Sequence, residues 1–397
     1  MKNSRNINLM RKFVLAFILL ILFITPVFAQ FRVLLYHAHS TFNFTESLFT
    51  QHMDFLKEHD YHPVTLDQFY GWIKNDDVMP IRPLVISFDD NYIPVYTTAY
   101  PILNARGFIA VNFTHTSYVG VVSGSGDHCD WNEIMEMENN HAFLTESHSK
   151  THPNLTTLSE SAAKEEIEGS KAAIESNMTS KVCNFIAYPG GNYNSTVITL
   201  CQNAGYLGGF TVGNAVNYKT TPLFELKRIG VDGASLETFK DRIGYNALPT
   251  PPPGEGWTID NKEVNFSIQS SGWNESTSDA GYYGNNYLSH DAGDGTHKVR
   301  WAAYLPSTSI YHVYAWWTSH PSRTSGAQYE IHHKNGTSLV TVNQKENGGA
   351  WNLLGTFEFT VDSAAMIFLN DSPDGSTAAD GIWFEPFTSR VTAWIYY

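Results

Sequence analysis

The chain of 397 residues is longer than one hydrophobic core usually supports, and its 42% apolar and 16% charged residues are typical of folded globular proteins. Its formal net charge of -14, with acidic and basic residues dispersed along the chain, excludes the basic footprint of a nucleic-acid-binding protein. We therefore expect two folded domains and no nucleic-acid partner.

The first 29 residues have the pattern of a secretory signal peptide. Lys and Arg residues precede an unbroken apolar run over residues 13–24, which is followed by Thr25-Pro-Val-Phe-Ala29. The run is shorter than the roughly 20 residues that a membrane-spanning helix needs. We expect cleavage before Gln30, with retention as an anchor as the alternative. A secreted or cell-envelope-associated location outside the cytoplasm follows from either outcome.

Cysteines are few. Cys129, Cys183 and Cys201 are too few and too scattered for a disulfide scaffold or a thiolate zinc site. A pair between Cys183 and Cys201 is one arrangement that the sequence allows, and it leaves the third thiol over.

Residues 31–246 alternate short β-rich apolar runs with longer amphipathic stretches, which is the pattern of βα units. Seven strands are expected, at residues 32–36, 84–88, 109–113, 142–146, 183–188, 207–212 and 225–231. Helices are expected between them, among others at residues 45–59, 94–106, 159–177 and 195–204. The sequence therefore predicts an α/β domain built as a deformed (β/α) barrel of about seven strands.

Ionisable residues follow several of these strands at the point where each strand ends. One run ends in His37, a second in Asp89 and Asp90, and a third in His148. A fourth run ends in the rigid turn Tyr188-Pro-Gly-Gly191. Since the carboxyl ends of barrel strands meet on one face, we expect these groups to surround one catalytic mouth.

Asp90, His148 and His152 supply one carboxylate and two imidazoles, a ligand set suited to Zn²⁺ or a similar divalent ion with an open position for water. The spacing of four between the histidines lets both rings face one ion. Asp89 and Asp90 point to opposite sides of an extended backbone, so one is expected to bind metal and the other to accept a proton. Taken singly, such histidines are more often surface or core residues, and an Asp pair is more often a turn or helix cap.

The three motifs together, in this order, resemble those of the NodB-like polysaccharide deacetylases, carbohydrate esterase family 4. The family motifs read T-F-D-D-G, H-S/T-x-x-H and R-x-P-aromatic-G, and the chain has Ser87-Phe-Asp-Asp-Asn91, His148-Ser-Lys-Thr-His152 and Ala187-Tyr-Pro-Gly-Gly191. The resemblance implies that Asp89 is the general base and that Asp90, His148 and His152 hold the metal. It also implies that the N–H of Gly190 stabilises the tetrahedral oxyanion.

The general acid is the least obvious residue. Most of the family uses a histidine of a C-terminal motif, and no such histidine lies near residues 225–232. The run Leu35-Tyr-His37 resembles the branch that includes poly-N-acetylglucosamine deacetylases, where an N-terminal histidine takes this role. The resemblance implies His37 as the acid, with His39 as the alternative. The other histidines of this region, His115, His128 and His141, are expected to be core or turn residues.

Three positions depart from the family pattern. Asn91 replaces the usual glycine after the metal-binding aspartate, Ala187 replaces an arginine that ordinarily orients the base, and Gly190 replaces an aromatic residue. None of these changes removes a metal ligand or the base. The sequence therefore predicts the reaction more firmly than the substrate.

Residues 247–256 contain four prolines and are expected to form a semi-rigid linker. Residues 257–386 consist of short alternating runs separated by turn residues, which predicts an all-β sandwich. Seven of the ten tryptophans lie there, as core residues or as platforms for sugar rings. We expect core positions for Trp301, Trp316 and Trp383.

This second region resembles the golvesin C-terminal-like or Xly carbohydrate-binding-like domains. The resemblance rests on Ile259-Asp-Asn261, Gly281-Tyr-Tyr-Gly284, Asn343-Gln344, Gly348-Gly-Ala-Trp-Asn-Leu-Leu-Gly355 and Ala379-Asp-Gly-Ile382. It implies binding to a polysaccharide or cell-wall polymer. The whole sequence thus predicts a secreted enzyme that depends on Zn²⁺ or another divalent transition metal and removes N-acetyl groups from N-acetylglucosamine polymers. An acetyl-ester hydrolase acting on acetylated xylan and a catalytically dead carbohydrate-binding protein are the alternatives.

Overall fold

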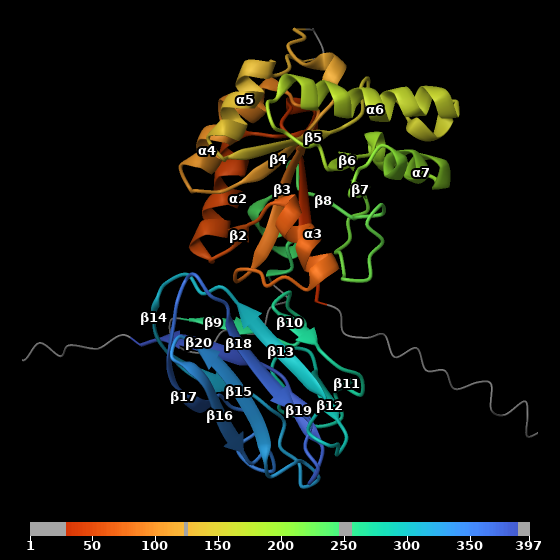
Figure 1. Cartoon of the computed structure of the whole chain (residues 1–397). Helices are drawn as coiled ribbons and strands as arrows, with labels where there is room; N and C mark the ends of the chain where they lie inside the picture. Colours follow the sequence, from red (N-terminus) through yellow and green to blue (C-terminus); the bar gives the residue numbers. More distant parts are fainter. Residues whose placement is uncertain (1–28, 123–125, 246–255, 388–397) are drawn as a thin grey trace, which may run out of the picture.

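The computed structural model describes residues 29–122, 126–245 and 256–387, which form an α/β domain followed by a β domain (Figure 1). The expected signal peptide, apart from Ala29, and the expected linker, apart from Gly256, lie outside the described residues. Within the described ranges, no helix is long and apolar enough to cross a membrane.

The α/β domain is built on a curled, all-parallel half-barrel sheet with the strand order β7-β6-β5-β4-β3-β1-β8. The strands are β1 Arg32–His37, β3 Pro83–Asp89, β4 Ala110–Thr114, β5 Phe143–Ser147, β6 Phe185–Ala187, β7 Gly208–Phe210 and β8 Ile229–Gly230, with the short β2 His62–Pro63 beside β3. The predicted seven-stranded α/β architecture is confirmed. The chain just before β8 also bridges to β7, because Leu226 pairs with Phe210. Residues 226–230 therefore lie between the two edges of the sheet.

Seven α-helices connect and cover the described strands: α2 Glu46–Glu58, α3 Leu66–Asn75, α4 Tyr100–Asn104, α5 Trp131–Asn139, α6 Glu160–Asn177, α7 Ser195–Asn203 and α8 Leu236–Arg242. Thr45 and Ser159 cap α2 and α6 by accepting hydrogen bonds from backbone N–H groups, as their residue types favour. The helix expected over residues 94–106 is interrupted, since Val95–Ala99 forms a π-helical turn before α4. Pro101 has no N–H for an ordinary helical hydrogen bond, which explains the irregular turn.

The helices bury the sheet, and strands β3 and β4 are buried along their whole length. This pattern is typical of parallel strands that are covered on both faces. All three cysteines are buried and free. The pair between Cys183 and Cys201 that the sequence allowed is therefore absent.

The β domain consists of antiparallel sheets, as the sequence predicted. Its strands are β9 Trp257–Ile259, β10 Phe266–Ile268, β11 Asn274–Ser276, β12 Tyr287–His290, β13 Lys298–Ala303, β14 Ser309–Ala315, β15 Ala327–His333, β16 Gly336–Val342, β17 Asn352–Phe359, β18 Ala365–Asn370, β19 Thr377–Ala379 and β20 Ile382–Pro386. The sheets β10-β13-β18-β15-β16 and β17-β14-β20-β9 share one core, and β11-β12-β19 forms a third sheet. Trp301 and Trp383 are buried as expected, whereas Trp316 is only half-buried.

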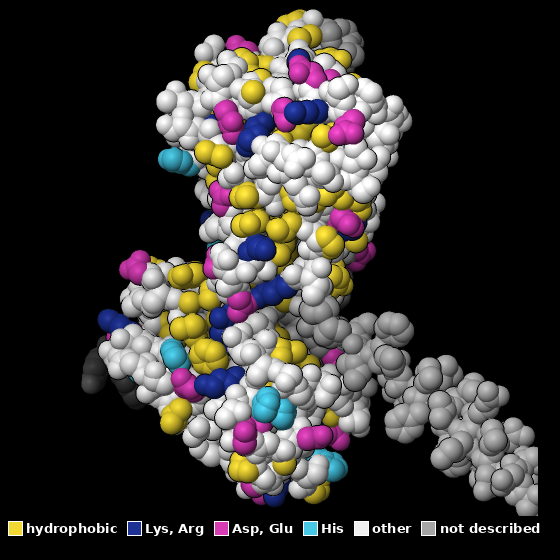
Figure 2. All heavy atoms as spheres, turned by 45° about the vertical axis from the view of Figure 1, so that its right-hand side comes forward, with side chains coloured by type: hydrophobic (Ala, Val, Ile, Leu, Met, Phe, Trp, Pro, Cys, Tyr) yellow, Lys and Arg dark blue, Asp and Glu magenta, His cyan; other side chains and the backbone are white. Residues whose placement is uncertain are grey.

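The β domain packs against the end of the α/β domain where the strands begin (Figure 1). The indole N–H of Trp72 donates to the carbonyl of Val264 at 3.2 Å, and Arg300 donates to Asp76 at 2.6 Å. Ile81, just before β3, belongs to the core of the β domain. Figure 2 shows acidic and basic side chains mixed over one face of both domains. Among the described residues, these contacts place the β domain at the opposite end of the α/β domain from the ends of its strands.

Candidate metal centre and catalytic site

The ionisable residues named from the sequence come together where the parallel strands end. His37 is the last residue of β1 and pairs in register with Asp89, the last residue of β3. His148 directly follows β5, whose last residue, Ser147, pairs with Ile186 of β6. The expectation that four strand ends aim these groups at one mouth agrees with this register.

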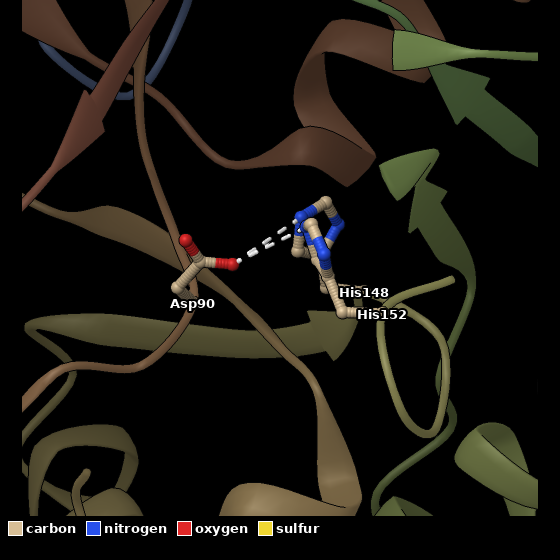
Figure 3. A group of neighbouring side chains, drawn as sticks. All are labelled: Asp90, His148 and His152. Atoms are coloured by element: carbon tan, nitrogen blue, oxygen red, sulfur yellow. Dashed lines mark ion pairs between the residues drawn. The ribbon is translucent and has the colours of Figure 1, made fainter. Parts of the chain in front are cut away.

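Asp90, His148 and His152 form a compact group of metal-ligand atoms (Figure 3). Oδ1 of Asp90 lies 3.6 Å from Nε2 of His148 and 3.6 Å from Nε2 of His152. Two atoms bonded to one tetrahedral zinc ion at about 2.0–2.2 Å are about 3.3–3.6 Å apart. Oδ1 of Asp90 is buried and has no hydrogen-bond partner within the described ranges. A cation between these three side chains would satisfy that oxygen, so the donor set fits a divalent metal ion.

The surrounding backbone fixes these ligands. Nδ1–H of His148 donates to the carbonyl of Ala187 at 2.8 Å, which leaves Nε2 free to face an ion. The carbonyl of Asp90 accepts a hydrogen bond from Nε2 of His115 at 2.7 Å. Burial lowers the pKa of His115 to about 4, so this ring is neutral near pH 7. Asp90 and His152 have φ values of 74° and 61°, a left-handed conformation that is uncommon outside glycine and often marks functional sites.

His115 and His128 were expected to be core or turn residues, and both are indeed buried. His115 also lies beside the metal-ligand group, since its ring centroid is 5.9 Å from that of His152, and His128 lies next to His115 with ring centroids 4.9 Å apart. Sequence reasoning missed this proximity. The position of His115 directly after β4 was the signal that could have revealed it.

Asp89 is held by a buried arginine. Nη1 of Arg228 lies 2.5 Å from Oδ1 of Asp89, and Nη2 lies 2.8 Å from Oδ2. Burial would raise the pKa of Asp89, but the charges of Arg228 and His148 outweigh it and hold that pKa below its usual range. Asp89 is therefore a carboxylate near pH 7. Arg228 supplies a cation next to Asp89, which Ala187 cannot supply.

Sequence reasoning missed Arg228, which lies in the run expected as the last strand. A fully buried arginine is rare unless it is paired, but the run Glu225-Leu-Lys-Arg-Ile-Gly-Val231 contains three charged residues and does not show which of them is buried. The sequence therefore held no signal that singled out Arg228. Identifying its partner required the fold, because Arg228 reaches Asp89 from the segment that joins the two edges of the sheet.

The two other departures from the family pattern have local explanations. Asn91 has φ 43°, and asparagine tolerates this left-handed region better than most residues, so the turn after Asp90 is retained. Gly190 has φ 60° in the turn after β6. That turn lies beside the metal group because His148 is hydrogen-bonded to Ala187.

His37 is paired with a carboxylate at the end of β8. Nδ1 of His37 lies 2.9 Å from Oδ2 of Asp232, and the ring stacks on Phe42 with centroids 4.1 Å apart. Burial lowers the pKa of His37, but the hydrogen bond to Asp232 and the charges of Asp89 and Asp232 raise it by more. His39 instead contacts Thr41 and the ring of Tyr92. The surroundings of His37 suit a proton donor better than those of His39.

The α/β domain thus combines a curled parallel half-barrel with a His₂Asp group and an Arg-paired carboxylate at its strand ends. Residues 76–209 match the polysaccharide deacetylase family, and residues 257–386 match the golvesin C-terminal domain family. The chain thus contains a NodB-like polysaccharide deacetylase domain followed by a golvesin C-terminal domain.

Curated relatives include proteins similar to parts of the chain. A xanthan lyase from Bacillus sp. (strain GL1) is 32% identical over 39% of this chain and 18% of its own length. The putative polysaccharide deacetylase YxkH of Bacillus subtilis is 27% identical over 53% of this chain and 78% of its own length. A poly-beta-1,6-N-acetyl-D-glucosamine N-deacetylase of Staphylococcus aureus is 30% identical over 43% and 61%.

Among solved structures, the Streptococcus pyogenes deacetylase PplD in complex with acetate matches with a TM-score of 0.50 and 24% identity. The match covers 54% of this chain and 99% of that structure. It supports the shared fold of the α/β domain.

Proposed function

We propose that the protein is a secreted or envelope-associated, zinc-dependent deacetylase that hydrolyses the acetamide groups of N-acetylglucosamine polymers. The observation that carries the proposal is the buried Oδ1 of Asp90, which has no hydrogen-bond partner among the described residues and faces the Nε2 atoms of His148 and His152, with Asp89 beside them. Two imidazoles and one carboxylate suit zinc better than calcium or magnesium, which prefer all-oxygen sites. The similarity to a poly-beta-1,6-N-acetyl-D-glucosamine N-deacetylase supports the polymer class.

In this proposal Asp90, His148 and His152 hold the zinc ion. When bound, such an ion polarises the acetyl carbonyl and lowers the pKa of water. Asp89 is the general base, because it lies beside His148 and remains ionised near pH 7, so it can accept a proton from the attacking water. The N–H of Gly190 donates to the oxyanion that develops on the acetyl carbonyl.

His37 is the proposed general acid that protonates the leaving amine. Asp232 accepts from its Nδ1–H, which fixes the ring and leaves Nε2–H as the proton to be donated. Asp232 is thus a positioning residue that acts through His37. The proposed pair resembles other catalytic histidines whose tautomer is set by a carboxylate.

An Asp232→Asn variant tests the role of the pair. The raised pKa of His37 keeps this acid protonated as pH rises, and activity is lost when pH passes through that pKa. Removing the carboxylate charge lowers the pKa of His37, so the alkaline limb of the kcat/KM profile is expected to move to lower pH. An unchanged alkaline limb in a folded variant with normal metal content would exclude His37 as the group that titrates there.

Substrate class is tested by acetate release from three polymers: β-1,6-linked N-acetylglucosamine oligomers, chitin oligomers and acetylated xylan. We expect release from an N-acetylglucosamine series and none from xylan. Release from xylan alone would favour the acetyl-ester hydrolase. No release from any of them by a zinc-loaded protein would favour the catalytically dead carbohydrate-binding protein.

The proposed organisation places the catalytic domain at residues 31–246, a linker at 247–256 and the golvesin domain at 257–386. Contacts between the domains lie where the barrel strands begin, and the proposed catalytic groups lie where those strands end. The β domain is therefore proposed to hold the enzyme on a polysaccharide or cell-wall polymer without lining the catalytic mouth.

A further inference from the structure

A second group of metal-ligand atoms lies in the β domain, away from the deacetylase site. His290, His297 and Asp371 each offer one ligand atom, and these atoms lie within 4.8 Å of one another. We infer that they form a second site for a transition-metal ion of the zinc class, which joins parts of the β domain to one another.

The three residues come from the ends of different strands. His290 ends β12, which belongs to the three-stranded sheet, and pairs with Thr377 of β19. His297 precedes β13 and Asp371 follows β18, just beyond the paired residues Lys298 and Asn370 of the five-stranded sheet. An ion held by all three would therefore connect the two sheets at one corner of the domain.

The distances suit a shared ion. Oδ2 of Asp371 lies 3.4 Å from Nδ1 of His297 and 3.8 Å from Nδ1 of His290. The two imidazoles lie side by side, with centroids 4.8 Å apart and an interplanar angle of 29°. The distances of 3.4 Å and 3.8 Å from Oδ2 of Asp371 are close to the roughly 3.3–3.6 Å expected between atoms bound to one tetrahedral zinc ion at about 2.0–2.2 Å. Nδ1–H of His290 donates to the carbonyl oxygen of Asp291 at 2.7 Å, so an ion that binds through this nitrogen replaces that proton.

The carboxylate of Asp371 is fixed with one oxygen left over. Oδ1 accepts from the backbone N–H of His297 at 2.9 Å, and the backbone N–H of Asp371 donates to the carbonyl of His297 at 2.9 Å. Oδ2 is buried and has no hydrogen-bond partner in the part of the chain that the structure describes. Nδ1 of His297 is also buried, and it too has no hydrogen-bond partner among the described residues. Leaving such buried polar atoms unpaired is costly, and a bound cation removes that cost.

The loop between β12 and β13 is built to approach this carboxylate closely. A Cβ atom added at Gly293 would lie 1.6 Å from Oδ2 of Asp371, so a side chain is not tolerated there. The side chain of Asp371 is fully buried, whereas that of His297 is 35% exposed. An ion can therefore reach the carboxylate from solvent past His297.

The donor set selects the class of ion. Two imidazoles and one carboxylate favour zinc and its neighbours over calcium and magnesium, which take oxygen ligands. The alternative occupant is a proton, which would turn one histidine into an imidazolium paired with Asp371. A metal count distinguishes these two states.

Zinc content of the full-length protein tests the inference. After loading with zinc and desalting, we expect about two equivalents per chain in the wild type and about one equivalent in a His290→Ala/His297→Ala variant. A His148→Ala/His152→Asn variant should keep about one equivalent, and combining all four changes should leave none. His320→Ala, at an exposed histidine of the same domain, is the matched control and should not change the count.

Thermal unfolding gives a second readout that does not depend on activity. Zinc should raise the Tm of the His148→Ala/His152→Asn variant, and adding His297→Ala should remove this rise, because only a bound ion stabilises by mass action. His297→Ala changes a half-exposed side chain, so loss of the fold is not expected. The His290→Ala/His297→Ala variant should keep its acetate release when zinc is supplied.

Either of two results would overturn the inference. One is a wild-type zinc content that falls to none in the His148→Ala/His152→Asn variant, which would assign the β-domain group to a proton-mediated ion pair. The other is binding of calcium but not zinc at the β-domain group. If the deacetylase site itself binds no zinc, the count becomes about one in the wild type and none in His290→Ala/His297→Ala, so the two proposals fail separately.

Discussion

An Asp89→Asn variant is expected to release acetate about 10²–10⁴-fold more slowly than the wild type, the usual range for losing a general base. The amide has nearly the same shape as the carboxylate but cannot accept the proton of the attacking water. Asp90, His148 and His152 are unchanged, so zinc content should remain at the wild-type level. The measurements are kcat/KM on an N-acetylglucosamine oligomer and zinc per chain.

The same variant leaves Arg228 without its counter-charge, which is a separate effect on stability. Breaking a buried ion pair by removing one partner typically costs about 3–5 kcal/mol, so the Tm should fall. Adding Arg228→Met removes the unpaired cation, since a methionine of similar length can fill the space. The Asp89→Asn/Arg228→Met protein should regain much of the Tm but no activity. Wild-type kcat/KM in a folded Asp89→Asn protein would remove Asp89 from the mechanism.

The proposed ligands could be named from the sequence because their signals are local. Asp90 and His148 directly follow apolar strand runs, and His152 is fixed by its spacing from His148. The carboxyl ends of the parallel strands of a barrel lie on one face, so residues that directly follow the strands lie close together there. For this reason the fold class and the compact metal group could both be anticipated.

The residues that pair with Asp89 and His37 could not be named from the sequence, because this pairing depends on which strands become neighbours in the sheet. Arg228 and Asp232 lie on either side of β8, and they reach Asp89 and His37 only because that segment lies beside β1. The group in the β domain is similar, since the pairing of β13 with β18 sets His297 beside Asp371. Hydrophobic alternation predicts that such strands exist but does not predict their order in a sheet.

Local backbone geometry also departs from what the apolar pattern of the sequence predicts. The expected helix at residues 94–106 was interrupted because Pro101 forced a π-helical turn, although its apolar pattern continued. Trp316 lies in an alternating region but is only half-buried, since it follows the last residue of β14. Alternation within a strand does not determine the burial of a residue just beyond its end.

Loss of the proposed catalytic metal should inactivate the enzyme, and His152→Asn tests this with little risk to the fold. The side chain of His152 is 38% exposed, and asparagine tolerates its left-handed φ of 61°. Losing a residue that only orients a metal ligand typically lowers activity by up to about 100-fold. His152 is itself a proposed ligand, so we expect acetate release at limiting zinc to fall by more than about 100-fold. Excess zinc should restore part of the activity, because Asp90 and His148 remain.

His141→Asn is the matched control, because it makes the same change at an exposed histidine with a similar φ of 57°. Its acetate release and zinc content should equal those of the wild type. A chelator should remove zinc from both proposed sites and abolish activity, and zinc should restore it. Because His290→Ala/His297→Ala should stay active while His152→Asn does not, activity is expected to follow the ion at Asp90 alone. Full activity of a His152→Asn protein in the presence of chelator would contradict a catalytic role for that ion.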